Sequence, residues 1–174
     1  MPMIQPTITY VIQGNPIFKN MRTDVVNQRG QTLYHRSRDI TLGSVQDRMK
    51  NEQGQVLWEM HKPMLSWSMN IKSQVFNTEI TLHLYGILKI GYDFTLNGQR
   101  YKIKKLSALF GQDFHLINAA SQEPLFTFEW AYLSMGKRGD LHMFPEAMQR
   151  YGVEESFLCA LALVYLDILE DNRN

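Results

Sequence analysis

The sequence predicts a mainly β protein, a closed antiparallel barrel of about twelve strands around a central, C-terminal hydrophobic helix. Three observations support this fold class. Short segments of alternating polar and apolar residues fill most of the first 145 residues. Turn sequences such as Asn-Gly separate these segments. The chain then ends in ESFLCALALVYLDILED, where the ten residues from Phe157 to Leu166 carry no polar group except a tyrosine hydroxyl.

Length and charge place the chain among ordinary globular proteins. Its 174 residues suit one domain spanning 1–174, and no low-complexity linker or charge run divides it. Eighteen basic residues face seventeen acidic ones, a net charge of +1. This balance argues against a nucleic-acid-binding protein, which usually carries a strongly basic face.

The single cysteine and the N-terminal residues indicate a compartment. Cys159 lies inside the apolar run, where a free thiol behaves as a small buried hydrophobe, and this favours a reducing compartment. The start, MPMIQPTITY, lacks the features of a signal peptide. No apolar stretch reaches the roughly 18 residues of a membrane span. We therefore expect a cytoplasmic protein without a transmembrane segment, whose membrane contact, if any, is peripheral.

Four segments read as β-hairpins. NQRGQTLYHRSR from Asn27 and NEQGQVLWEMHK from Asn51 share the pattern N-x-x-G-Q-x-L-aromatic at an offset of 24 residues. In FTLNGQRYKIKKL, the pair Asn97-Gly98 is the strongest hairpin signal in the chain, because both residues tolerate positive φ. FHLINAASQEPLFTFEW predicts two strands with a longer connection.

Strands are expected over about residues 7–144, with boundaries near 7–12, 22–27, 31–37, 44–51, 55–61, 66–72, 78–84, 87–96, 99–105, 113–118, 124–133 and 140–144. The segment NTEITLHLYG shows the pattern most clearly. Ile80, Leu82 and Leu84 share one face, and Glu79, Thr81, His83 and Tyr85 share the other, as in a half-buried antiparallel strand.

Two helices follow Pro145. PEAMQRYG predicts a short helix over about 145–151 that stops near Gly152. A second helix is expected over about 154–170, with Glu154 and Glu155 in its first turn, where they complement the helix dipole. Asp167, Glu170 and Asp171 bring polarity back at its far end.

The second helix fixes the architecture. A helix that is apolar all round is buried on all sides. Its seventeen residues make a rod of roughly 25 Å by 10 Å, and nearly all other residues belong to strands. Twelve strands tilted near 40° enclose a radius of roughly 12 Å, enough for one helix and its side chains. Small Ala160 and Ala162 suit close approach of the strands.

A barrel of about twelve strands, built from G-Q-x-L-aromatic hairpins and ended by FLCALALVYLDIL, resembles the tubby C-terminal-like superfamily. That superfamily includes the tubby proteins, the phospholipid scramblases and the plant LURP-one-related proteins. The resemblance covers almost the whole chain, which is similar to small single-domain fungal tubby-like proteins. It implies a central helix inside the barrel. The proline-rich N-terminus, cysteine cluster and terminal membrane segment of scramblases, and the long N-terminal extension of tubby proteins, have no counterpart here. Neither lipid scrambling nor transcriptional regulation is therefore transferred.

The segment QRYKIKK predicts a basic strand face. Arg100, Lys102 and Lys104 alternate with Tyr101 and Ile103, Lys105 follows, and Lys89 lies on the preceding strand. Such a row of cations could hold a phosphoinositide headgroup, the ligand that the tubby resemblance implies. No residue-by-residue match to a tubby headgroup motif supports these positions, so the assignment rests on charge pattern. The other interpretation is the solvated face of an amphipathic hairpin.

A second basic pair lies in SMGKRGDLH, where Lys137 and Arg138 are expected in a glycine-flanked loop. Backbone amides and two cations could cradle a phosphate there; a plain hairpin loop is the alternative. The tripeptide Arg138-Gly139-Asp140 is treated as a chance match to an adhesion motif.

Catalytic and metal sites are not expected. The five histidines are scattered without metal-ligand spacing, and His83 beside Glu79 and Thr81 is typical of an exposed strand face. No nucleophile elbow or phosphate loop occurs, so the sequence predicts no enzyme, catalytic residue, metal or cofactor.

We expect the large aromatic side chains to pack in the core or at the barrel rim. These are the tryptophans Trp58, Trp67 and Trp130 and the strand residues Phe94, Phe126 and Phe128. Met60, Met64 and Met69 suggest either an adaptable surface or packing at a barrel end.

The sequence thus predicts a non-enzymatic binding module for an anionic phospholipid such as a phosphoinositide, or for a protein partner. The alternatives are a barrel that carries a small apolar ligand and a structural scaffold for protein interactions. The oligomeric state stays open.

Overall fold

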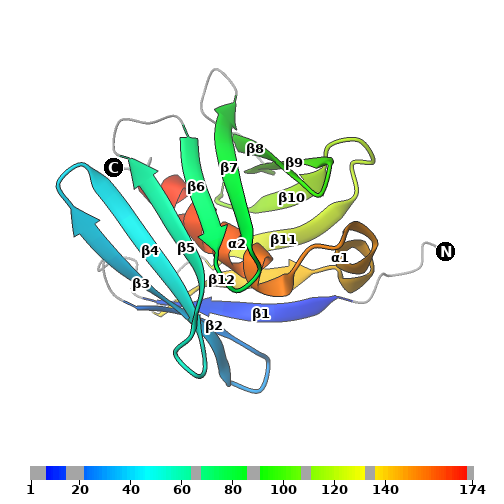
Figure 1. Ribbon diagram of the computed structural model, residues 1–174. Coiled ribbons are helices and arrows are strands. Elements are labelled where there is room, and N and C mark those ends of the chain that lie inside the picture. The colour runs from blue at the N-terminus through cyan, green and yellow to red at the C-terminus, as the bar shows by residue number, and fades with distance from the viewer. Residues whose placement is uncertain are drawn as a thin grey trace.

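Twelve strands form a closed antiparallel barrel in the computed structural model (Figure 1), which describes residues 7–14, 22–63, 68–85, 91–106, 111–131 and 136–171. Each strand pairs with its neighbours in the chain, and the last pairs with the first. The strands are β1 (Ile8–Gln13), β2 (Thr23–Val26), β3 (Thr32–Thr41), β4 (Ser44–Asn51), β5 (Val56–Pro63), β6 (Ser68–Ser73), β7 (Thr78–Tyr85), β8 (Gly91–Leu96), β9 (Gln99–Lys105), β10 (Phe114–Asn118), β11 (Pro124–Trp130) and β12 (Lys137–Met143). The predicted fold class is confirmed.

The observed strands follow the predicted ones in order, and most of their ends agree closely. The clearest differences are the end of β3, at Thr41 instead of the predicted 37, and the start of β12, at Lys137 instead of the predicted 140. Parts of three predicted strands, namely 66–67, 87–90 and 132–133, lie outside the described residues.

The repeated Asn-x-x-Gly sequences fold into two equivalent turns. In each copy, the asparagine Oδ1 accepts hydrogen bonds from the backbone N–H groups two and four residues later. The distances are 2.9 and 3.0 Å at Asn27, and 3.1 and 2.9 Å at Asn51. The glycines Gly30 and Gly54 have φ values of 80° and 78°, a left-handed conformation that glycine adopts without steric cost. The repeat therefore encodes the β2–β3 and β4–β5 hairpins.

Two helices close the chain: α1 (Pro145–Tyr151) and α2 (Glu155–Asp171). Proline at the start of α1 and left-handed Gly152 after its end mark both boundaries of this helix. Glu154 lies one residue before α2 rather than in its first turn. Its carboxylate accepts a hydrogen bond of 2.7 Å from the backbone N–H of Ser156 and so caps the helix.

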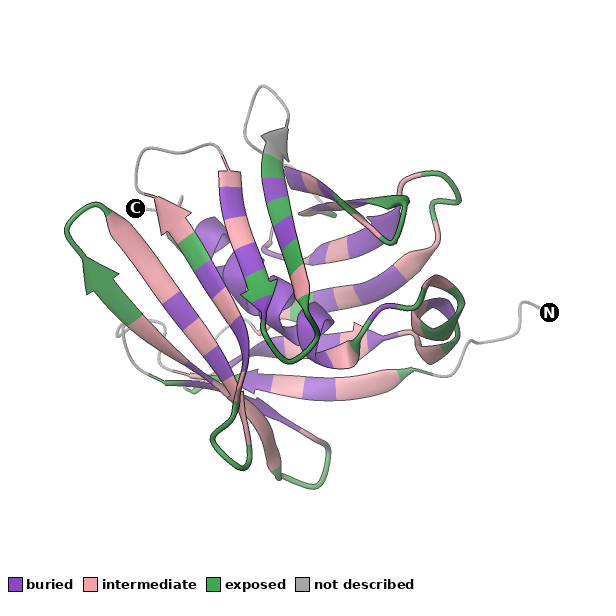
Figure 2. Ribbon diagram, viewed as in Figure 1, coloured by how far each residue is buried: buried purple, intermediate pink, exposed green. Residues whose placement is uncertain are grey.

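Helix α2 runs through the inside of the barrel, and every residue from 156 to 170 is buried (Figures 1 and 2). Aromatic rings from the strands pack along it. Phe157 lies 5.1 Å from Trp58 and 5.6 Å from Phe94, and Tyr165 lies 4.9 Å from Phe114, between ring centroids. Burial of one large apolar side chain contributes about 1.5–3 kcal/mol. The predicted central helix is confirmed.

The two ends of the barrel differ. One end carries α1, the start of α2 and the turns after the even-numbered strands β2 to β10. At the other, which we call the distal end, lie the last residues of α2, the turn between β3 and β4, and the end of β9. In the described part of the chain, no helix is long and apolar enough to cross a membrane.

Candidate functional site

The predicted basic face of β9 exists. Tyr101 and Ile103 are 1% and 0% exposed in the core, so Arg100, Lys102 and Lys104 project from the outer side of the barrel. Successive members of this row are about 6.6 Å apart along the strand. The alternation that predicted the face is confirmed, and we call these three residues the basic row.

Neighbouring strands modify the charge of the basic row. Arg100 forms an ion pair with Asp93 on β8. Asp93 itself lies opposite Lys102 in the strand register. On the other side, Lys104 lies opposite His115 on β10. Burial and, second, the nearby Lys104 lower the pKa of His115. At neutral pH this histidine therefore adds no positive charge to the row.

The remaining cations predicted near this strand do not join the row. Lys105 follows the inward-facing Ile103 by two residues, so it lies half-buried on the inner side at the distal end. The next residue, Leu106, is 52% exposed. Lys89 lies outside the described residues.

The predicted loop at Lys137 and Arg138, whether phosphate-binding or a plain hairpin loop, is wrong, because both residues belong to strand β12. Lys137 pairs on the outside with Asp140, at 2.8 Å between Nζ and Oδ2. Arg138 points inward and is 4% exposed. The following Gly139 leaves room for Phe128 on β11, because a Cβ at this position would come within 2.2 Å of the Phe128 ring.

Arg138 belongs to a buried ion cluster that sequence reasoning missed. Its Nη2 lies 2.7 Å from Asp167 Oδ1 and 2.7 Å from Glu170 Oε2, both on α2. Arg38 on β3 binds Asp47 on β4 through two hydrogen bonds of 2.8 and 2.9 Å. The same Arg38 reaches Asp167 Oδ2 at 2.6 Å.

Arg36, two residues before Arg38 on the same face of β3, completes the cluster. It contacts Asp167 closely, and its Nη2 donates a hydrogen bond of 2.9 Å to Thr23 Oγ1. Burial, followed by the nearby charges Arg38 and Arg138, lowers the pKa of Arg36 to about 9. Asp47 opposes this shift. Arg36 therefore stays positively charged at neutral pH.

The ion cluster is electrically balanced and buried. Three arginines face three carboxylates (Arg36, Arg38 and Arg138; Asp47, Asp167 and Glu170), and each side chain is at most 9% exposed. Removal of one member of such a buried set costs about 3–5 kcal/mol, because its partner is left uncompensated. The cluster therefore fixes the last turns of α2 to strands β3, β4 and β12.

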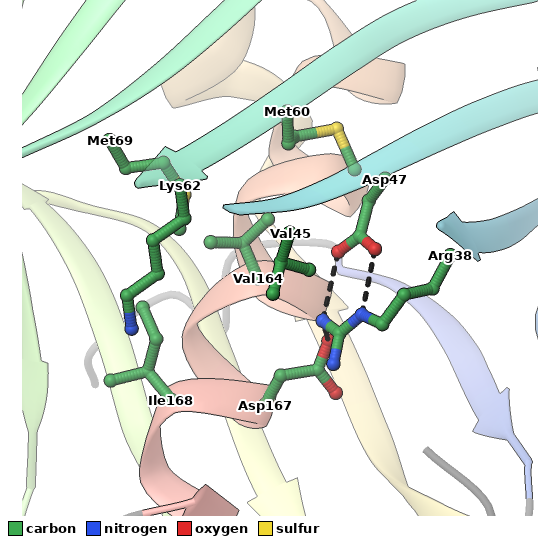
Figure 3. A pocket seen from close by; sticks show the side chains of 9 residues that line it. All are labelled: Arg38, Val45, Asp47, Met60, Lys62, Met69, Val164, Asp167 and Ile168. Atoms are coloured by element: carbon green, nitrogen blue, oxygen red, sulfur yellow. Dashed lines mark hydrogen bonds and ion pairs between the residues drawn. The ribbon is translucent and has the colours of Figure 1, made fainter. Parts of the chain in front are cut away.

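A cavity of about 150 Å³ adjoins the cluster at the distal end (Figure 3). Strands β3 to β6 and the last turns of α2 enclose it. The apolar side chains that line it are Val45, Met60, Met69, Val164 and Ile168, and the charged ones are Arg38, Asp47, Lys62 and Asp167. Arg38 and Lys62 lie on opposite sides of the cavity in Figure 3.

Two of the methionines singled out in the sequence thus meet at this cavity. Met60 and Met69 are 2% and 5% exposed and come from neighbouring strands.

Trp58 packs inside the barrel and donates a hydrogen bond of 2.8 Å to Ser156 Oγ. Met64 and Trp67 lie outside the described residues. Phe94, Phe126 and Phe128 are buried in the core as predicted, and Trp130 packs against it.

The titratable groups elsewhere form no recognisable catalytic set in the described ranges. Glu79, Thr81 and His83 share an exposed face of β7, and Glu79 accepts a hydrogen bond of 2.8 Å from Asn70. Cys159 is fully buried in α2, and burial raises the pKa of its thiol. Within those same ranges, no group of His, Cys, Asp or Glu side chains could hold a metal ion.

Comparison with known proteins identifies the fold alone. No family model matches the chain, and no curated protein matches its sequence. The solved X-ray structure of an Arabidopsis thaliana protein, AT5G01750, is similar, with a TM-score of 0.64. The alignment covers 93% of this chain and 91% of the Arabidopsis chain at 10% sequence identity. The barrel around a central helix is therefore shared over nearly the full length of both chains.

Proposed function

We propose that this chain is a non-enzymatic binding module that attaches peripherally to anionic phospholipid, with phosphoinositide as the preferred class. The observation that carries the proposal is the basic row on β9. Burial of Tyr101 and Ile103 holds Arg100, Lys102 and Lys104 in a line on the outer surface. A line of cations on a rigid strand presents its charge to a flat anionic surface without an entropic cost of ordering a loop.

The magnitude suits reversible attachment. A lysine or arginine near an anionic leaflet contributes about 1 kcal/mol. Three such residues therefore supply at most about 3 kcal/mol, less what their contacts within the protein retain, such as the ion pair between Arg100 and Asp93. Half-exposed Leu106 follows the same strand and adds an apolar group that can enter the interface. Weak, salt-sensitive binding is the expected behaviour.

Two further points support the proposal. The hairpin repeats and the terminal helix resemble those of the tubby C-terminal-like superfamily, and we propose that the chain is a small single-domain member of it. Phosphoinositide is the ligand associated with tubby-like domains. A cytoplasmic location, peripheral at a membrane, belongs to this proposal.

Two alternative functions remain. A protein partner or scaffold role could use the same outer face of β9. A carrier role finds little room in the middle of the barrel, because α2 is buried along its length. The cavity beside Asp167 is the space that favours a carrier role.

Charge reversal tests the lipid proposal. The variant Arg100→Glu, Lys102→Glu, Lys104→Glu should lose binding to phosphoinositide vesicles in co-sedimentation. A matched control reverses three other exposed cations, Arg22→Glu, Arg29→Glu and Lys72→Glu, and thereby changes net charge equally. The control should retain most binding. Equal loss in both variants, or no loss in the first, would remove the basic row as the site.

A further inference from the structure

The cavity at the distal end combines an apolar wall with a cation at its mouth. Met60, Met69, Val164 and Ile168 form the apolar part, and all four are buried. Val45 and Lys62 are only half-buried, so the cavity is open to solvent on their side. A cavity of about 150 Å³ holds a group of the size of benzene, or several methylene groups.

The charges around the cavity favour an anion. Asp47 and Asp167 line it, but both are held by arginines of the ion cluster at 2.6–2.9 Å, which leaves little of their charge for a ligand cation. Lys62, on the half-buried rim, is the lining cation that does not belong to the ion cluster. Its ammonium has three donors, so it can bind a carboxylate in addition to contacts within the protein.

We propose that this cavity binds a single-chain carboxylate amphiphile, a fatty acid, with its carboxylate on Lys62 and its alkyl chain against Met60, Met69 and Ile168. Methionine side chains adapt to alkyl chains because they are unbranched and polarisable. This site is separate from the basic row, and it binds its ligand without a membrane. Its test therefore succeeds or fails independently of the proposed lipid-surface function.

Octanoate is the probe, and the readout is NMR of protein labelled with ¹³C at the methionine methyl groups. Variants Met60→Leu and Met69→Leu assign the two signals. Octanoate should shift both signals in a saturable way. Octylammonium, with the same chain and opposite charge, and acetate, with the charge and no chain, should each bind at least tenfold more weakly.

Chain length gives a second readout. Each methylene that enters an apolar cavity raises affinity about fourfold. From butanoate to octanoate, affinity should therefore rise by about that factor per carbon and level off where the cavity is full. A flat series, or signals at Met60 and Met69 that do not move, would overturn the proposal.

Substitutions separate the site from nonspecific binding. Lys62→Gln at the half-buried rim should weaken octanoate at least tenfold and leave octanol unchanged. Lys72→Gln, an exposed lysine on β6 outside the cavity, is the matched control and should change neither. Val45→Phe at the mouth should exclude all chains. Equal octanoate affinity in wild type and Lys62→Gln would contradict the proposal.

Neutral vesicles with and without oleate identify the source of the ligand. Shifts with free octanoate support a ligand taken from solution. Shifts only with oleate-containing vesicles support the same chemistry with the membrane as the source. Absence of shifts in both arms overturns the site.

Discussion

Arg138 on β12 and Asp167 on α2 form an ion pair inside the barrel, with 2.7 Å between Nη2 and Oδ1 and 3% of each side chain exposed. The pair links the wall of the barrel to the helix that fills it. At the other end of α2, Phe157 packs against Trp58 and Phe94. The helix is therefore held by aromatic packing at its start and by buried charge at its end.

Removal of one charge from the cluster should be costly. Arg138→Met leaves Asp167 and Glu170 without their shared partner, and we expect a loss of about 3–5 kcal/mol in the free energy of unfolding. Lys137→Met, next to it on the outer side of β12, removes an exposed pair and should cost less than about 1 kcal/mol. Urea denaturation measures both. Equal, small losses would mean that the cluster does not fix α2.

The helix should not tolerate a new charge in its middle. Leu161 and Leu163 are 0% exposed, so Leu161→Asp or Leu163→Asp buries an unpaired carboxylate and should unfold the protein. Leu42→Asp, at the fully exposed turn between β3 and β4, is the control and should leave circular dichroism and the melting temperature unchanged. A folded Leu161→Asp protein would place α2 outside the barrel.

The two repeated turns should contribute equally to stability. Asn27→Ala and Asn51→Ala each remove an Oδ1 that accepts two backbone N–H groups. Each should lower the free energy of unfolding by about 1–2 kcal/mol. The turns are distinct, so the double variant should lose the sum of the two. A loss confined to one turn, measured by urea denaturation, would show that the sequence repeat is not an energetic repeat.

Burial of Cys159 should appear in the pH dependence of stability. Burial raises the pKa of this thiol in the folded protein, whereas in the unfolded chain it titrates near the ordinary value of roughly 8.5. The stabilising contribution is complete below that pH and falls as pH rises above it, because the unfolded chain releases the proton first. Denaturation of wild type and Cys159→Ala between pH 7 and pH 10 should show a steeper decline for wild type. Parallel curves would contradict this.

Local sequence carried enough information for most of the fold. Alternation at Ile80 and Leu82, turn chemistry at Asn97-Gly98, and the uniform hydrophobicity from Phe157 to Leu166 each depend on neighbouring residues. The basic row on β9 follows from the same alternation. These patterns gave the strands, the hairpins and the central helix.

The ion cluster could not be predicted in this way. Arg38 and Asp167 are separated by 129 positions and meet only after the barrel closes around α2. In the sequence, Asp167 and Glu170 mark the polar C-terminal end of the helix, although their i, i+3 spacing puts them on one face. Arg36 and Arg38 also share one strand face. This pair of arginines on the inner face of a strand is the signal in the sequence that points to the ion cluster. The flanking glycines Gly136 and Gly139 predict a loop at Arg138, whereas Gly139 in fact makes room for Phe128.

The most direct test of the proposed function is co-sedimentation of the wild-type protein with neutral, phosphatidylserine and phosphoinositide vesicles at low and physiological salt. We expect binding to both anionic vesicles, strongest to phosphoinositide. We also expect little binding to neutral vesicles, and weaker binding at physiological salt because exposed charges are screened. Absence of the protein from every pellet, or equal pelleting with neutral vesicles, would contradict attachment through the basic row.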